Sequence, residues 1–323
     1  MPANLTPAYF EAERRFRAAK SPLEKLAALE EMLAVMPKHK GTDHLRAELR
    51  TRIAKLNQSF DKKTATQRAS MVIEKVGAAQ IAVTGLTNAG KSQLVSSITN
   101  AAPTVGAYPF TTHSATPGMM PFENIQVQLI DTPPLAPQSI EWWLPHMLRR
   151  ADALLIVVDL SDDPLTRMED TITQLGKMRV GLAAREPGED ETILSQKKAL
   201  VAGNKMDLDD GENFRALQNK YGELPVVAIS ATTGSGLEEL KRTIYQTLDI
   251  IRVYTKAPGQ KPDFTDPIIL DRGSTLENAA SSVHKDFTAR MKYARIWGSG
   301  KHDGIMAKRD HVLQDGDIIE LHL

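Results

Sequence analysis

The chain has 323 residues, of which 41% are hydrophobic, and this is enough apolar material for one large core or a few smaller ones. It has no cysteine, no apolar run of about 18 residues and no charged-then-apolar leader, so disulfides, membrane spans and secretion are not expected. The 40 Lys and Arg residues balance the 40 Asp and Glu residues, so the overall charge indicates no partner. Cytoplasm is the expected compartment, and the oligomeric state stays open.

Residues 1–76 are predicted to form a helical segment. The sequence SPLE at residues 21–24 has the pattern of a capping box, and leucines follow it at helical spacing. A second amphipathic run covers residues 44–56. The segment holds 15 Lys and Arg against 9 Asp and Glu, which fits an RNA-facing arm and also fits a helix with a solvated basic face.

Residues 77–250 alternate short apolar strands with helices. The helices are predicted at residues 91–98 and 238–251, and the strands at IAVTG, VQLID, ALLIVVD, KALVAGN and PVVAIS. Strands that alternate with helices in this way form a mostly parallel sheet with helices on both faces. The predicted fold class is therefore α/β.

Residues 251–323 predict a small α+β module. A helix is expected at residues 275–284, among short strands at RVYT, PIILD, ARIWG and DIIELHL. Aromatic side chains near basic ones in this segment would suit RNA bases, but aromatics in short strands more often belong to a core. The aromatic residues are Tyr254, Phe264, Tyr293 and Trp297, and the basic ones are Lys256, Lys261, Lys292 and Arg295.

The sequence GLTNAGKS, residues 85–92, carries the clearest chemical signal. It fits the pattern Gly-x-x-x-x-Gly-Lys-Ser and lies between a predicted strand and a predicted helix, as a phosphate-binding loop requires. The glycines allow backbone N–H groups to turn toward a phosphate at the positive end of the helix dipole. Lys91 would pair with the β- and γ-phosphates, and the Ser92 hydroxyl would bind Mg²⁺.

The sequence NKMD, which ends a predicted strand, narrows the nucleotide to GTP. The carboxylate of Asp207 can accept two N–H bonds from guanine, whereas adenine offers no such pair. Asn204 would brace the loop and bond at the base, and Lys205 would lie over it. Ser230 and Ala231 complete the pocket, with the Ala231 N–H expected to donate to guanine O6.

The stretch YPFTTHSATPG, residues 108–118, is the predicted switch. Thr112, with Thr111 as the alternative, would close over Mg²⁺ and the γ-phosphate when GTP is bound. Asp131 ends the strand VQLI, from which a carboxylate holds Mg²⁺ through water. Asp159 ends another strand, and there a structural role is favoured.

The order of GLTNAGKS, YPFTT, DTPP, NKMD and SAT resembles the five guanine-nucleotide motifs of translation-factor-class GTPases, and YPFTT resembles their Obg-related branch. The last segment, with RVYTKAPGQKPDF, YARIWG and KRDHVLQDGDIIELH, is similar to the TGS module, a ubiquitin-like β-grasp domain, of the developmentally regulated GTP-binding (DRG) proteins. The sequence PKHKGTDHLRAELRTRIAKL resembles the helical segment before their G domain. The resemblance implies a Mg²⁺-dependent GTPase that acts on the ribosome or RNA in translation, with a helical segment at 1–76, a G domain at 77–250 and a TGS domain at 251–323.

Two features depart from the family pattern. Asp131 and Asn204 are too close in sequence for the extra small domain of eukaryotic DRG proteins, so partners of that insert are not carried over. Within DTPPLAP, Pro134 and Leu135 replace the Gly whose N–H contacts the γ-phosphate and the residue, often Gln, that orients water. Proline has no N–H and leucine cannot polarise water. Hydrolysis is therefore expected to be slow without an activator or K⁺, and a GTP- or GDP-binding scaffold with negligible hydrolysis is the alternative.

An apolar residue in place of the catalytic Gln also links this chain, by resemblance, to GTPases that use a K⁺ ion beside the phosphates. Asn88 matches the residue that coordinates K⁺ in them, although an Asn that only braces the loop is an equal alternative. The predicted catalytic residues are Lys91, Thr112 and Asp131. The predicted ligands are Ser92, Thr112 and Asp131 for Mg²⁺ and Asn88 for K⁺. The predicted nucleotide-binding residues are Gly85, Asn88, Ala89, Gly90, Lys91, Ser92, Gln93, Asn204, Lys205, Asp207, Ser230 and Ala231.

Overall fold

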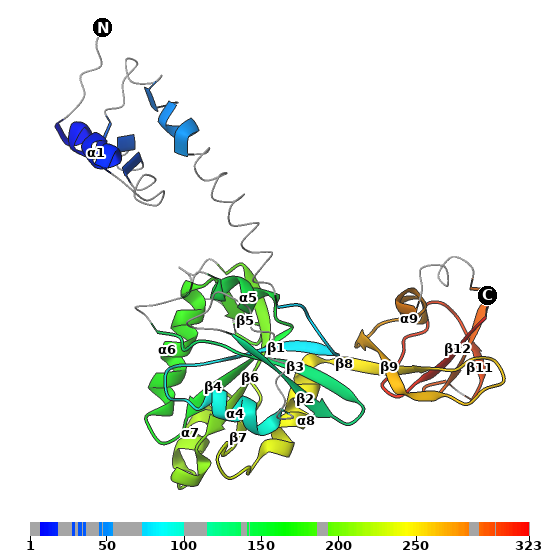
Figure 1. The fold of residues 1–323 in the computed structure, drawn as a ribbon. Coiled ribbons are helices and arrows are strands. Elements are labelled where there is room, and N and C mark those ends of the chain that lie inside the picture. The colour runs from blue at the N-terminus through cyan, green and yellow to red at the C-terminus, as the bar shows by residue number, and fades with distance from the viewer. Residues whose placement is uncertain are drawn as a thin grey trace. The chain divides into compact units, whose positions relative to one another are not determined.

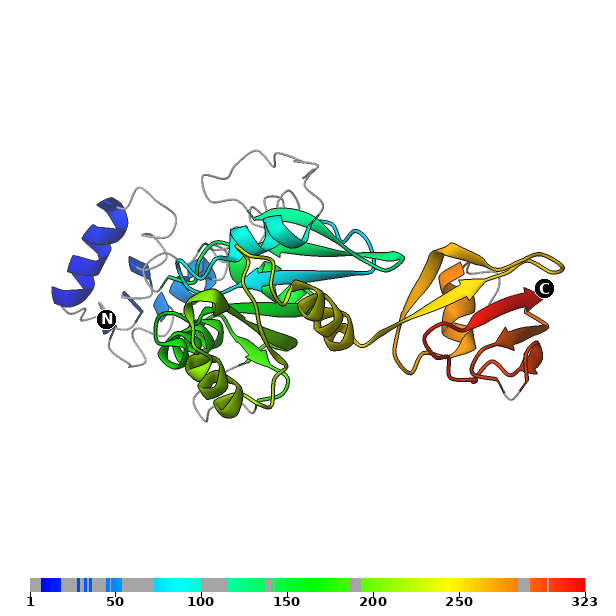
Figure 2. The same ribbon diagram turned by 90° about the horizontal axis from the view of Figure 1, so that it is seen from below.

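The structure is a computed structural model of the chain, shown in Figures 1 and 2. The residues that it describes are 7–18, 28, 29, 32, 33, 35, 36, 45, 46, 48–53, 73–99, 115–136, 141, 143–185, 193–283, 291–300 and 302–322. The chain divides into two compact units, Met1–Val72 and Ile73–Leu323, and each is described by itself. No helix in the described part of the chain is long and apolar enough to cross a membrane.

The first unit is helical where it is described. Helix α1 covers Pro7–Ala18, and the described residues at 45, 46 and 48–53 are also helical. A small apolar cluster holds the unit together, with Tyr9, Leu29, Met32, Met36 and Leu49 buried in it. Leu29 and Leu49 belong to the two leucine patterns that predict helices here, whereas the predicted capping box at 21–24 lies outside the described residues.

The second unit begins with a sheet of seven strands among the described residues, in the order β2-β3-β1-β4-β6-β5 with β7 beside β6. Its strands pair in parallel except for β2 with β3 (Figure 1). The mostly parallel α/β fold predicted from the sequence is confirmed. The strands are β1 Ala79–Thr84, β2 Thr116–Phe122, β3 Ile125–Asp131, β4 Ala153–Asp159, β5 Val180–Leu182, β6 Ser195–Asn204 and β7 Val226–Ala228.

Helices cover both faces of this sheet. Along β4, Leu155 and Val157 pack on the face covered by α4 and α8, while Leu154 and Ile156 pack on the face covered by α5, α6 and α7. Strands buried on both sides are apolar throughout, and every residue of β4 is buried. The helices are α4 Lys91–Ile98, α5 Leu144–Arg150, α6 Pro164–Lys177, α7 Glu212–Lys220 and α8 Leu237–Leu248, with a short 3₁₀ helix, η1, at Met206–Leu208.

Parallel register brings the predicted motifs to one edge of the sheet. Val83 of β1 pairs with Asp131 of β3, and Asp159 of β4 pairs with Asn204 of β6. The phosphate loop follows β1 directly and leads into α4. In an open α/β sheet, ligands bind at this carboxyl edge of the strands.

Two elements differ from the sequence prediction. Residues 116–118 were expected in a loop, but they begin β2, an edge strand that tolerates the prolines of TPGMMPF because only one side pairs. Helix α8 ends at Leu248 rather than at residue 251. Asp249 takes a left-handed conformation with φ 55°, and the chain then enters the next strand.

The rest of the second unit is a five-stranded sheet with α9, Leu276–Val283, packed on one face (Figure 2, orange helix). The strand order is β11-β10-β12-β8-β9, with β8 and β12 parallel, as in a β-grasp fold. Of the aromatic residues singled out, Tyr254 is buried while Phe264 is exposed. Lys256 lies over the Trp297 ring at 4.2 Å from its centre. The strands are β8 Ile250–Thr255, β9 Asp263–Asp271, β10 Tyr293–Trp297, β11 Ile305–Ala307 and β12 Ile318–His322.

Arg252 of β8 connects the two sheets of this unit. Its guanidinium donates to Asp315 Oδ2 at 2.8 Å, in the turn before β12 of the smaller sheet, and to Glu123 and Asn124 in the turn between β2 and β3. Asn124 also donates to the Tyr254 hydroxyl at 2.7 Å. The turn that lies between the predicted switch and Asp131 is therefore tied to the carboxy-terminal module.

Candidate nucleotide-binding site

The phosphate loop has the geometry that its glycines predict. Gly90 stands at the start of α4 with φ 86°, and a Cβ there would lie 2.3 Å from Nδ2 of Asn204. Only glycine fits this close approach, which brings the loop against the residue that begins NKMD. The first backbone N–H groups of α4 have no partners within the helix, so this end of the loop can receive a phosphate.

Lys91 is buried in this loop. Its Nζ donates to the carbonyl oxygens of Gly85 at 3.1 Å and Leu86 at 2.8 Å. Burial lowers the pKa of Lys91, and the nearby charge of Asp131 opposes that shift. The ammonium is thus held inside the loop by weak carbonyl partners, which an anionic phosphate can replace.

Ser92 and Asp131 form a hydrogen-bonded pair beside the loop. Ser92 Oγ donates to Asp131 Oδ2 at 2.6 Å, while Asp131 Oδ1 is buried and has no hydrogen bond to any described residue. Burial raises the pKa of Asp131, against the opposing effects of Ser92 and Lys91. A hydroxyl and a carboxylate with a free oxygen fit a Mg²⁺ ion, which takes few protein ligands and completes its shell with water and phosphate oxygens. Within the described residues, no group of three or more His, Cys, Asp or Glu side chains could hold a metal instead.

The segment DTPPLA is fixed on both sides of its two prolines. Thr132 Oγ1 donates to the Val83 carbonyl at 2.8 Å, and the Leu135 N–H donates to the Gly85 carbonyl at 3.1 Å. The Leu135 side chain is 1% exposed and packs into the core between the sheet and α5. Pro134 is exposed and lines a cleft of about 430 Å³ together with Asn88, Lys91, Ser92 and Asp131. Residues 133 and 134 have no N–H and that of residue 135 is engaged, so this segment offers no backbone donor to the cleft.

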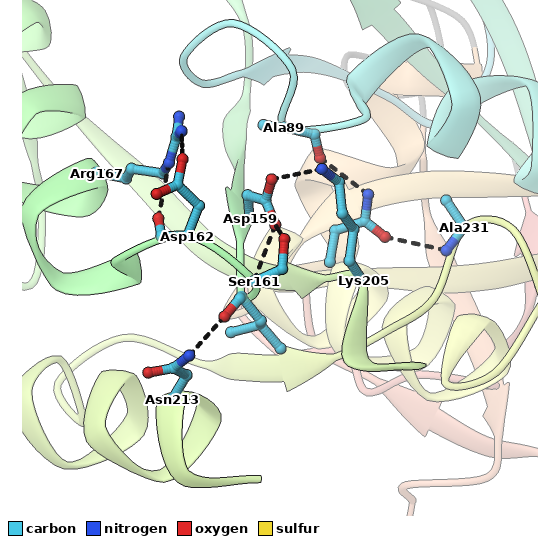
Figure 3. Close-up of polar contacts among 10 residues, drawn as sticks. Ala89, Asp159, Ser161, Asp162, Arg167, Lys205, Asn213 and Ala231 are labelled. Atoms are coloured by element: carbon cyan, nitrogen blue, oxygen red, sulfur yellow. Dashed lines mark hydrogen bonds and ion pairs between the residues drawn. The ribbon is translucent and has the colours of Figure 1, made fainter. Parts of the chain in front are cut away.

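Asn204 ties the base side of the site together by bonds to Ala89 and Ala231, two residues labelled in Figure 3. Its Nδ2 donates to the Ala89 carbonyl of the phosphate loop at 2.9 Å, and its Oδ1 accepts the Ala231 N–H at 3.0 Å. The bracing role expected for Asn204 therefore has a geometric basis. The Ala231 N–H, expected to be free for guanine O6, is engaged here, so O6 would share it with Asn204 or use the N–H of Thr232.

Asp207 and Ser230 have different surroundings. Asp207 lies on η1 and is exposed, and its carboxylate has no partner among the residues that the structure describes. A free carboxylate at this edge can accept two N–H groups from a ligand. Ser230 is fully buried, and its Oγ accepts the Thr233 N–H at 3.1 Å, which shapes the turn after β7 rather than facing a ligand.

Lys205 makes an ion pair that the sequence motifs do not indicate. Its Nζ lies 2.5 Å from Oδ2 of Asp159, which is 3% exposed (Figure 3). Asp159 was assigned a structural role from the sequence. The sequence signal is that its strand and the strand of NKMD both end in polar residues, and the structure adds that these two strands are neighbours in the sheet.

Of the remaining predicted residues, the structure describes Asn88 and Gln93 but not Thr111 and Thr112. Asn88 has φ 62°, a left-handed conformation that Asn tolerates, and it lines the cleft, as does Gln93 of α4. Thr111 and Thr112 lie outside the described residues, so the structure does not test the predicted switch contact.

Comparison with known proteins identifies the family. Residues 80–186 match the family described as 50S ribosome-binding GTPase, and residues 251–323 match the TGS domain. The chain is 31% identical over 360 aligned positions to an uncharacterized GTP-binding protein of Methanocaldococcus jannaschii, with 92% of each chain covered. The chain belongs to the DRG-like family of GTP-binding proteins with a TGS domain.

Other relatives of this DRG-like chain are more distant. Human developmentally-regulated GTP-binding protein 2 is 24% identical over 361 positions, which cover 93% of this chain and 98% of the human protein. The G domain of the T. maritima FeoB iron transporter superposes with a TM-score of 0.39 and 26% identity, over 52% of this chain and 98% of that one. The two sequence alignments are longer than the 323 residues of this chain, so these relatives contain residues that have no counterpart here. GTPases of this family generally use Mg²⁺.

Proposed function

We propose that this chain is a Mg²⁺-dependent GTP-binding and GTP-hydrolysing switch protein that acts on the ribosome or RNA in the cytoplasm. The observation that carries the nucleotide part is the side chain of Asn204, which joins the phosphate loop at Ala89 to the turn at Ala231. The match of residues 80–186 to a GTPase family supports a GTP site formed by these loops.

At the phosphate end, the backbone N–H groups from Gly85 to Gly90 and those at the start of α4 bind the phosphates. Lys91 exchanges its carbonyl partners for the β- and γ-phosphates. Ser92 and Asp131 hold Mg²⁺, with Thr112 closing over it when GTP is present. The metal neutralises phosphate charge during transfer to water, while the chain's own residues orient the phosphates.

At the base end, Asp207 accepts the guanine N1 and N2 protons, and Lys205 lies along the ring. Adenine would leave the carboxylate without these two donors, and so the site selects guanine by the bonds that adenine cannot make.

Hydrolysis is slow in this proposal. Leu135 is packed in the core and cannot orient water, and Pro134 gives no N–H to the γ-phosphate. Without a supplied arginine, such sites turn over at about 10⁻⁴ to 10⁻² per second. A K⁺ ion at Asn88 would supply part of the missing positive charge.

Pro134 and Leu135 also favour a second candidate function, that of a scaffold that binds GTP or GDP and hydrolyses GTP negligibly. Single-turnover hydrolysis of γ-labelled GTP by the full chain separates the two. The switch releases labelled phosphate in a Mg²⁺-dependent way, and Lys91→Ala abolishes the release. Retention of labelled GTP by the unsubstituted chain, without phosphate above the Lys91→Ala background, would establish the scaffold.

The ribosome or RNA partner is supported by the family description for residues 80–186 and by the TGS match. The bonds from Arg252 to the β2–β3 turn connect that module to the amino end of β3, the strand whose other end carries Asp131. Co-sedimentation with ribosomes is expected to be stronger with a non-hydrolysable GTP analogue than with GDP. Absence of co-sedimentation in both states would defeat the translation part of the proposal.

A further inference from the structure

Asp159 is a buried carboxylate next to the base pocket, and none of the predicted nucleotide contacts uses it. It ends β4 directly beside Asn204 in the parallel register with β6. Its Oδ2 accepts Lys205 Nζ at 2.5 Å, and its Oδ1 accepts the N–H and hydroxyl of Ser161 at 2.9 and 2.6 Å (Figure 3). Burial raises the pKa of Asp159, but the bonds from Lys205 and Ser161 outweigh it and hold this pKa below its usual range. The carboxylate is therefore ionised and fixed.

The backbone of Lys205 is turned so that its side chain can reach this carboxylate. Lys205 has φ 65°, a left-handed conformation in which the chain leaves the line of β6. Its neighbour Asn204 is fixed by bonds to Ala89 and Ala231, so the turn is held from both sides. The ammonium is thereby directed to β4, away from the outer edge of the loop.

Asp207 is the other carboxylate available to Lys205. It is two residues further along, exposed, and without a partner among the described residues. An unrestrained lysine beside it would be attracted to it, because opposite charges a few ångströms apart attract even near water. Guanine binding needs the Asp207 carboxylate to be free, because this carboxylate accepts both the N1 and the N2 protons of the base.

We propose that Asp159 is a positioning residue for nucleotide binding. It holds Lys205 at the side of the base pocket, keeps Asp207 free to accept the guanine N–H groups, and so lengthens the time for which the nucleotide stays bound. This inference rests on the proposed GTP-binding function. A lysine that is already held also loses less side-chain freedom when the base arrives, which favours binding.

The test is the dissociation rate of a fluorescent GDP analogue from the full chain, with Mg²⁺ present and unlabelled GDP as the chase. Asp159→Asn keeps the shape and removes the charge, and it should speed dissociation about 10- to 100-fold, less than the loss of a fully buried charge pair would, because the Lys205 side chain is 32% exposed. Asp162→Asn is the matched control. Asp162 lies in the same loop and pairs with Arg167 on the surface, so its loss should leave the rate within about twofold.

A double variant distinguishes positioning from general structural support. If Asp159 acts through Lys205, Asp159→Asn combined with Lys205→Met should release GDP no faster than the faster single variant, because the shared interaction is lost only once. If instead the dissociation rate of the double variant rose by the product of the two single effects, Asp159 would act independently of Lys205, and the inference would be overturned.

Ser161→Ala keeps the test decisive if Asp159→Asn does not fold. It removes one hydroxyl bond to the carboxylate and retains the ion pair, so dissociation should quicken about two- to fivefold. An unchanged rate in folded Asp159→Asn protein, or in Ser161→Ala protein where Asp159→Asn does not fold, would overturn the inference while leaving GTP binding intact. Failure of the unsubstituted chain to bind the GDP analogue would instead overturn the proposed function, and the inference with it.

Discussion

The two ends of the candidate site differ in how completely the protein itself builds them. At the base end, Asn204 spans from Ala89 to Ala231, and Lys205 is bonded to buried Asp159. At the phosphate end, Asp131 Oδ1 is buried without a partner among the described residues, and the prolines beside it offer no N–H. The loops of the base end are held in place by the protein's own bonds, with Asp207 left free for a ligand, whereas the phosphate end leaves a buried carboxylate oxygen that a metal can satisfy.

This difference bears on what the site can detect. Hydrogen bonds that are already made before binding fix the loops, so guanine meets a shaped pocket. To move a two-state switch from 1:99 to 99:1, GTP must bind the active state about 5.5 kcal/mol more favourably than the inactive state. Because residues 133–135 donate no N–H to the γ-phosphate, this preference of GTP for the active state has to come from Mg²⁺ and the predicted contact of Thr112. We therefore expect substitutions at the base end to cause large losses of nucleotide affinity. Substitutions near the γ-phosphate should cause smaller, graded changes in the preference for GTP over GDP.

The largest effect is expected from Asp207→Asn. Two charge-assisted bonds to guanine, at about 1.5–3 kcal/mol each, correspond to a loss of GDP affinity of about 10²- to 10⁴-fold. Xanthine carries an acceptor where guanine carries its amino group, so the new amide should bind xanthosine diphosphate better than the carboxylate does. Equilibrium titration with both nucleotides measures the change. Asp210→Asn, a nearby exposed carboxylate, is the control, and equal losses in the two variants would show that Asp207 does not read the base.

Ser92→Ala should have the next largest effect, at the metal. It removes the hydroxyl that bonds Asp131 and would bind Mg²⁺, and one such contact corresponds to an affinity loss of about 10- to 100-fold. The variant should bind GDP equally well with Mg²⁺ and with EDTA, whereas the unsubstituted chain should release GDP faster in EDTA. Ser96→Ala, on the exposed side of the same helix, should keep the Mg²⁺ dependence. A Mg²⁺ effect that persists in Ser92→Ala contradicts the metal assignment.

A smaller effect is expected from Asn88→Ala in K⁺. Hydrolysis by the unsubstituted chain should be about tenfold faster in K⁺ than in Na⁺, because a cation near the phosphates stabilises transition-state charge. Asn88→Ala should reduce the rate in K⁺ to that in Na⁺, and Thr87→Ala, in the same loop, should not. Equal rates of the unsubstituted chain in the two salts would leave Asn88 as a loop residue, consistent with its left-handed φ of 62°.

Local sequence patterns were enough to predict much of the secondary structure at the phosphate end. The helix predicted at residues 91–98 coincides with α4, because the glycines before it and its apolar spacing are local signals. The pairing of Ser92 with Asp131 follows from parallel register, since the loop that leads to Ser92 on α4 leaves β1 beside Asp131, which ends the neighbouring strand β3. In contrast, β2 was missed because Pro and Gly in TPGMMPF argue against a strand, and its pairing with β3 overrides that local preference.

Contacts between distant strands could not be predicted in the same way. The bond from Lys205 to Asp159 depends on β4 and β6 being neighbours with Asp159 opposite Asn204, which strand patterns alone do not fix. The burial of Leu135 depends on how the Gly85 carbonyl holds its N–H. The engagement of the Ala231 N–H by Asn204 likewise requires the phosphate loop to be in place first.

The smallest effect, and the sharpest test of the phosphate end, is expected from Pro134→Gly. Thr132 and Leu135 anchor the segment on either side, so glycine restores one N–H in a loop that is otherwise unchanged. If that N–H reaches the γ-phosphate, the ratio of GTP-analogue to GDP affinity should rise about tenfold, as expected for one charge-assisted bond near the lower limit of its range. Pro133→Gly is the matched control, because it adds the same backbone freedom but places its N–H one position before the expected donor. A ratio that rises equally in both variants would mean that loop flexibility is responsible, and an unchanged ratio in Pro134→Gly would show that this GTPase distinguishes GTP from GDP without any donor from this segment.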